Sequence, residues 1–176
     1  MIKKLEDLLN LMPEEKKNIA FSIWQKYKIE FETLPGSINK HQAWPGGYKD
    51  HIQEVMNIAE LLFDSLSKLR ELPFLLDSAL FILFIHDYDK LVRYQKTENG
   101  FERKDDYSDM TEEIQNFLKK EFNYSLSQEE LNALKYIHGE GKNYSANERV
   151  MQPLAAFVHC CDTISARIWH DYGKSR

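Results

Sequence analysis

The chain contains 176 residues, of which 43% are hydrophobic and 29% are charged, and these proportions predict a single globular domain over residues 1–176. The net charge of −5 excludes a basic field over the whole protein that would attract nucleic acid, although a local basic groove stays open. The N-terminus lacks the apolar stretch of a signal peptide, and no apolar run is long enough to cross a bilayer. We therefore expect a cytoplasmic protein without a membrane partner, whose adjacent Cys160 and Cys161 are reduced core residues.

Residues 1–32 predict a helical extension, with short amphipathic helices at 3–11 and 14–28. The segment 33–50 is rich in proline and glycine, which predicts a loop. This loop carries a histidine and a tryptophan, and Asp50 is expected to cap the next helix and to place His51 in its first turn. Because loops on a rigid scaffold often carry binding groups, the segment is a candidate part of a site.

A continuous apolar run leads directly into a His–Asp pair. Residues 81–85 read Phe-Ile-Leu-Phe-Ile, and His86 and Asp87 follow. The run is apolar on all sides and contains no glycine or proline, so we predict a buried helix over 74–88. Burying a carboxylate and an imidazole is costly unless hydrogen-bonding partners or a metal ion compensate. The pair is therefore the centre of the predicted site.

The remaining segments also have helical periodicity. Apolar spacing predicts helices at 51–70 and 111–121, separated by a solvated loop at 95–110. A capping box formed by Ser127 and Glu130 begins a helix that reaches His138, and Pro153 begins the last helix, 153–171. Because almost nothing alternates like a strand, the predicted fold is all-α.

Several side chains that can bind metals lie at the ends of these helices or on the last one. They are His51, His86, Asp87, His138, His159 and Asp162. His159 and Asp162 are three residues apart and share one helix face. Imidazole nitrogens combined with carboxylate oxygens suit a divalent transition ion, namely Mn, Fe, Co, Ni or Zn. The spacing does not choose among these metals.

The order His51, His86–Asp87, Asp162 resembles the ligand pattern of the HD-domain metal-dependent phosphohydrolase superfamily. The stretch FIHDYDK is similar to the family's apolar-HD-x-G-K context, with Asp89 in place of the usual glycine. The loop NKHQAWPGG resembles the family's approach to the first ligand, and VHCCDTISAR resembles its last metal-binding helix. The resemblance covers residues 38–170. It implies an HD-type helical bundle that holds a metal at the four residues of this pattern.

A metal at these ligands suggests a mechanism in which the surrounding residues have roles. Asp87, Asp89 and His138 are expected to be catalytic, and His138 and His159 are candidates for a second metal. The expected contacts to substrate come from cations that neutralise phosphate and from loop residues, with Trp44 and Tyr48 as partners for a base. The predicted substrate-binding residues are Lys40, His41, Trp44, Lys90 and Arg93.

The expected function is hydrolysis of a nucleotide mono- or triphosphate. A small chain of negative net charge favours a free nucleotide over a long nucleic acid, although nucleic acid stays open as a partner. Two alternatives remain: a two-metal phosphodiesterase or 3′–5′ exonuclease, and a degenerate domain that binds a nucleotide or a protein without turnover. The resemblance also leaves a homodimer open.

Overall fold

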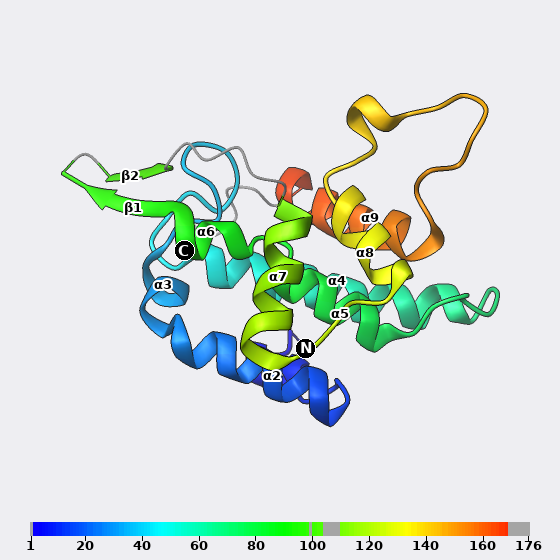
Figure 1. The fold of residues 1–176 in the computed structure, drawn as a ribbon, viewed down its shortest axis with the longest axis horizontal. Helices are drawn as coiled ribbons and strands as arrows, with labels where there is room; N and C mark the ends of the chain where they lie inside the picture. Colours follow the sequence, from blue (N-terminus) through cyan, green and yellow to red (C-terminus); the bar gives the residue numbers. More distant parts are fainter. Residues whose placement is uncertain (1, 99, 104–109, 169–176) are drawn as a thin grey trace.

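The computed structural model describes residues 2–98, 100–103 and 110–168, and within these ranges the chain is mostly helical (Figure 1). This confirms the predicted all-α class. The elements, in chain order, are α1 (Leu5–Leu9), α2 (Glu14–Lys26), α3 (Lys28–Thr33), α4 (Gly47–Ser67), α5 (Leu76–Ile85), α6 (Tyr88–Arg93), β1 (Tyr94–Thr97), β2 (Gly100–Arg103), α7 (Met110–Phe122), α8 (Gln128–Tyr136), a 3₁₀ turn η1 (Gly141–Asn143) and α9 (Pro153–Ile168).

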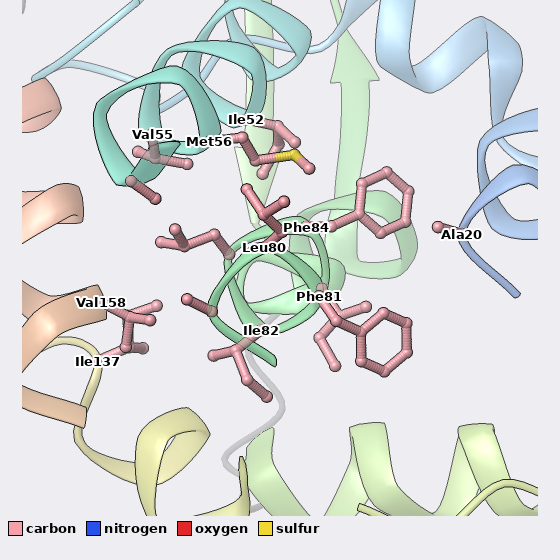
Figure 2. Packing of buried hydrophobic residues seen from close by; sticks show 14 of the residues in the cluster. Ala20, Ile52, Val55, Met56, Leu80, Phe81, Ile82, Phe84, Ile137 and Val158 are labelled. Atoms are coloured by element: carbon pink, nitrogen blue, oxygen red, sulfur yellow. The ribbon is translucent and has the colours of Figure 1, made fainter. Parts of the chain in front are cut away.

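Helix α5 lies at the centre of the hydrophobic core. Every residue from Ala79 to Ile85 is buried, because other helices cover α5 on all sides. Figure 2 shows this surrounding layer, which includes Ala20 of α2, Val55 of α4 and Val158 of α9. The predicted buried helix is confirmed, and its C-terminal end is fixed in position by α4 and α9.

The chain leaves the α5 helix earlier than predicted. His86 is the C-cap of α5, and Asp87, with φ −103° and ψ 22°, is the N-cap of the short helix α6. The predicted helix over 74–88 is thus two helices joined at the His–Asp pair. Both side chains stay buried at this junction, with relative exposures of 1% and 3%.

The predicted solvated loop at 95–110 is wrong for its first part, while residues 104–109 lie outside the described ranges. Residues 94–97 and 100–103 form an antiparallel hairpin in which Tyr94 pairs with Arg103 and Thr97 with Gly100. The hairpin extends away from the helices in Figure 1. Its four-residue strands show no strict alternation of buried and exposed residues, which explains why periodicity did not reveal them.

Helix α4 begins four residues earlier than predicted, so the predicted cap at Asp50 is wrong. Gly46 is the N-cap, and its φ of 81° suits a residue without a Cβ. Asp50 lies inside the helix and accepts a hydrogen bond from Trp44 Nε1 at 2.8 Å. His51 consequently lies in the second turn, with its side chain fully buried.

Other predicted boundaries agree to within a few residues. The capping box is confirmed, because Ser127 Oγ accepts from Glu130 N at 3.2 Å and Glu130 Oε2 accepts from Ser127 N at 2.9 Å. Positions 169–171 of the last predicted helix lie outside the described residues. Cys161 is buried, but Cys160 is exposed on the next face of α9, so its predicted core position is wrong. No described helix is long and apolar enough to cross a membrane.

Candidate metal centre

Three buried side chains meet where α5 passes into α6. His51 comes from α4, His86 ends α5, and Asp87 lies at the junction. Each offers a ligand atom, and the three atoms lie within 4.8 Å of one another. A group of two imidazoles and one carboxylate in this arrangement could hold a metal ion.

The closest distances in this group join the Nε2 atoms of the two histidines to each other and to one carboxylate oxygen. His51 Nε2 lies 3.4 Å from His86 Nε2. Asp87 Oδ2 lies 3.3 Å from His86 Nε2 and 3.6 Å from His51 Nε2. These atoms therefore face a common space with no apolar side chain between them.

Asp162, on α9, brings a second carboxylate to the same place. Its Oδ1 lies 3.2 Å from His51 Nε2 and 3.8 Å from His86 Nε2. The structure thus brings together all four predicted ligands from three helices and a junction. That they bind a metal together stays a prediction.

Burial and charge together set the protonation of these groups. Burial lowers the pKa of His51 to about 4, so its imidazole is neutral near pH 7. For Asp87, burial opposes ionisation, but neighbouring His86, Lys90 and His51 hold its pKa well below the usual range. Burial likewise opposes ionisation of Asp162, but a hydrogen bond from His138 and the neighbouring imidazoles of His86 and His51 lower its pKa. Near pH 7 the centre therefore combines two ionised carboxylates with the neutral imidazole of His51.

His86 behaves differently from His51. Burial disfavours its charged form, but the adjacent Asp87 carboxylate outweighs burial and raises the pKa of His86. Its Nδ1 lies 2.7 Å from the carbonyl oxygen of Leu83, which can only accept, so Nδ1 carries a proton. The nitrogen that binds or releases the second proton is therefore Nε2, the atom that faces the other ligands.

His138 lies at the solvent side of the group. Its side chain is 63% exposed, its Nδ1 lies 3.2 Å from Asp162 Oδ2, and its Nε2 lies 4.0 Å from Asp87 Oδ1. His159 is directed elsewhere, because its Nδ1 donates to the carbonyl of Ile137 at 2.6 Å. Among the described residues, no hydrogen bond or ion pair joins His159 to the predicted ligands, and its role in a second metal site stays a prediction.

Two of the predicted cations, Lys90 and Arg93, and the predicted catalytic Asp89 each have a protein partner. Lys90 Nζ pairs with Asp87 Oδ2, and Arg93 Nη2 lies 2.5 Å from Glu113 Oε2. Asp89 accepts from Arg103 Nη2 at 2.8 Å. A phosphate group would have to share Lys90 and Arg93 with these carboxylates.

The loop residues that were predicted to contact substrate differ in their exposure to solvent. His41 is half-buried, and its ring centroid lies 4.8 Å from that of His51. Lys40 is exposed and Trp44 is half-buried. Tyr48 is fully buried with its ring edge-on to Phe31 at 4.9 Å, so the prediction that it stacks on a base is wrong.

Sequence reasoning did not identify three residues that hydrogen-bond to one another behind the predicted ligands: the buried Gln42 and Ser165 and the half-buried Glu54. A signal was present for two of them. Glu54 is three residues after His51, and Ser165 is three residues after Asp162, so each lies one helical turn from a predicted ligand. Applying this spacing to each ligand would have found both.

Comparison with known proteins returned no relative. No protein-family model matches the chain, and no curated protein or solved structure matches it. The side chains and their arrangement are therefore the basis for inferring a function.

Proposed function

We propose that the chain is a metal-dependent phosphohydrolase of the HD type that acts on a nucleotide mono- or triphosphate. One observation carries the proposal: two buried imidazoles and a buried carboxylate converge within 4.8 Å, and Asp162 lies 3.2 Å from one of these imidazoles. Four ligands in the order of the HD pattern thus come from helices distant in sequence. Burying charged groups is costly unless partners or a metal ion compensate, and an ion bound between these side chains would do so.

The donor set fits a divalent transition ion. His51 is neutral near pH 7, Asp87 and Asp162 are ionised, and nitrogen and oxygen donors together suit Mn, Co, Fe, Ni or Zn. Asp162 would complete the ligand set formed by His51, His86 and Asp87. An ion bound there would supply an activated water and polarise a phosphoryl oxygen.

Residues beside the ligands are suited to move protons. His138 is exposed and its Nδ1 is oriented by Asp162, so its Nε2, which lies 4.0 Å from Asp87 Oδ1, can also contact a substrate that approaches from solvent. We assign it proton transfer to the leaving group or contact with phosphate. Burial and the charge of Asp87 raise the pKa of Asp89, while Arg103 opposes them, so Asp89 is a second candidate for holding a proton.

The proposed substrate contacts follow from charge and position. Lys90 and Arg93 are buried beside the centre, and Lys40 is exposed on the preceding loop. These cations would neutralise phosphate charge as it develops. His41 and the half-buried ring of Trp44 are the proposed contacts to the rest of the nucleotide.

A second candidate function, nucleotide binding without turnover, is favoured by the Lys90–Asp87 pair. The ammonium of Lys90 contacts Oδ2 of Asp87, which is the oxygen nearest both histidines. A lysine that remained there in the presence of metal would compete with the ion for this oxygen. Stoichiometric nucleotide binding with no product would support this function over hydrolysis.

The test of the proposed function is the substitution Asp87→Ala. The variant should lose phosphate release from nucleotides in the presence of Mn²⁺ or Co²⁺ while its circular dichroism remains helical. The matched control is Asp64→Ala, which removes an exposed carboxylate from the far part of α4 and should leave turnover unchanged. Full activity in Asp87→Ala would refute the proposal, and preferential cleavage of bis(p-nitrophenyl) phosphate by the wild type would indicate a phosphodiesterase.

A further inference from the structure

A hydrogen-bond network of two buried residues and one half-buried residue lies behind the two histidines that come from α4 and the preceding loop. Its central group is Glu54, whose Oε2 accepts from Ser165 Oγ at 2.5 Å and from Gln42 Nε2 at 2.8 Å. Gln42 and Ser165 are 2% and 0% exposed. Each of these two donors also contacts a histidine, so Glu54 connects to both rings.

The first branch runs through Ser165 to His51. Because the hydroxyl proton of Ser165 is donated to Glu54, its oxygen can only accept from His51 Nδ1, which lies 3.0 Å away. His51 therefore carries its proton on Nδ1, and its Nε2 has an unshared electron pair. That pair faces Asp162 Oδ1 at 3.2 Å, an arrangement that is repulsive unless a cation lies between them.

The second branch runs through Gln42 to His41. The amide nitrogen of Gln42 donates to Glu54 and also to Ser165 Oγ at 3.2 Å, which fixes the orientation of the amide. Its carbonyl oxygen then accepts from His41 Nδ1 at 2.8 Å. His41, like His51, is left with an unprotonated Nε2.

The loop is built around Gln42 at the cost of backbone strain. Gln42 has a φ of 42°, a left-handed conformation that residues other than glycine rarely adopt. The backbone carbonyl oxygen of Gln42 accepts hydrogen bonds from the backbone amides of Gly36 and Trp44, both at 2.9 Å. A Cβ at Gly47 would lie 1.9 Å from that carbonyl oxygen, so only glycine permits the approach. A strained residue held by so many contacts is characteristic of a functional site.

We infer that Glu54 is the positioning residue of the centre: through Ser165 and Gln42 it holds His51 and His41 with Nε2 unprotonated. The inference rests on the proposed function, because it treats the group around His51 as a divalent metal site. Among the described residues, no hydrogen bond or ion pair joins Glu54 to the four predicted metal ligands. Glu54 acts by selecting the tautomer in which His51 can donate a lone pair to a cation.

The direct test is ¹⁵N NMR of the histidine rings in metal-free protein near pH 7, with Co²⁺ affinity measured by calorimetry in parallel. We expect wild-type His51 to be protonated at Nδ1, with its resonances assigned by comparison with His51→Gln. Ser165→Ala should move the proton of His51 to Nε2 or to a mixture and weaken Co²⁺ binding by about 10–100-fold. Ser165→Thr, which keeps the hydroxyl, should restore both readouts.

Two further variants keep the test decisive. Thr163→Ala removes an exposed hydroxyl from the same helix and should change neither readout. Glu54→Met removes the acceptor but keeps the bulk, so Ser165 can donate to His51 Nδ1 and the tautomer should shift as in Ser165→Ala. An Nδ1–H tautomer of His51 and unchanged Co²⁺ affinity in both Ser165→Ala and Glu54→Met would overturn the inference.

The failure of the proposed function would be recognised separately. If wild-type protein binds no Co²⁺, the metal proposal fails whatever the tautomer. The NMR comparison of wild type, Ser165→Ala and Glu54→Met still decides whether the network sets the protonation of His51.

Discussion

At the scale of single residues, the neighbours of Asp87 decide how the centre handles protons. Its carboxylate faces His51 and His86 and forms an ion pair with Lys90. The same carboxylate raises the pKa of His86, whereas burial lowers that of His51 to about 4. Two imidazoles whose Nε2 atoms lie 3.4 Å apart thus differ in protonation, and only His86 has a proton to lose near neutral pH.

This difference predicts a pH dependence of metal affinity. A metal must displace the proton from His86 Nε2, so affinity should rise with pH until the raised pKa of His86 is passed. Below that pKa we expect about one proton released per ion and about a tenfold gain in affinity per pH unit. His51 contributes nothing to this slope because it is already neutral. Co²⁺ titrations between about pH 6 and pH 8 measure this dependence of affinity on pH. An affinity that does not change with pH would contradict the protonation of His86 at Nε2.

A second prediction concerns His138, which is exposed and adjacent to both carboxylates. His138→Ala should lower turnover by about 10²–10⁴-fold, the usual contribution of a general acid or base. The metal should remain bound, because His51, His86, Asp87 and Asp162 are unchanged. Steady-state kinetics together with metal analysis of the variant measure both effects. Loss of the metal along with activity would instead make His138 a ligand.

At the scale of elements, the loop before α4 and the α5–α6 junction place the predicted metal ligands. The loop is folded back on itself by Gly36, Gln42 and Gly47, so that Tyr48 N can donate to Leu34 O at 3.0 Å. The junction is a break between two helices, which leaves the side chains of His86 and Asp87 beside α4 and α9. Small shifts in either segment would separate the ligands.

Substitution of Gly47 tests the loop. In Gly47→Ala the new Cβ would meet the backbone oxygen of Gln42 at 1.9 Å, so the loop must move. We expect a loss of at least about 3 kcal/mol in the free energy of unfolding. Gly141→Ala is the control, because no atom lies within 4 Å of a Cβ there; its positive φ of 51° accounts for the loss of about 1 kcal/mol that is expected. Chemical denaturation gives both values, and equal losses would contradict the packing described for Gly47.

At the scale of the whole molecule, the core and the site depend on the same helix. The apolar run of α5 is buried on every side, and its last turn delivers His86 to the centre. This is why the position of the His–Asp pair could be predicted from the sequence: the burial of residues 79–85 follows from their composition, and it determines where the next two residues lie. His51 and Asp162 are placed by the packing of α4 and α9 on that helix.

The features that could not be predicted depend on contacts between distant segments. The β1–β2 hairpin has weak alternation, and the position of Cys160 depends on how α9 is rotated against α8. Gln42 connects the loop to α4 and α9 because it has a positive φ and hydrogen-bonds to side chains in both helices. No local sequence pattern indicates these features. Sequence periodicity reports the buried face of a helix, but it does not report which buried polar groups face one another.

We propose that one bound metal joins helices α4, α5 and α9. The most direct measurement is the metal content, by elemental mass spectrometry, of wild type and His86→Ala purified without chelators. We predict about one transition ion per chain in the wild type, and its loss in the variant because one of the ligand imidazoles is missing. His159→Ala should keep the ion. A wild-type protein with no bound transition metal, and no phosphohydrolase activity on addition of Mn²⁺ or Co²⁺, would contradict the account.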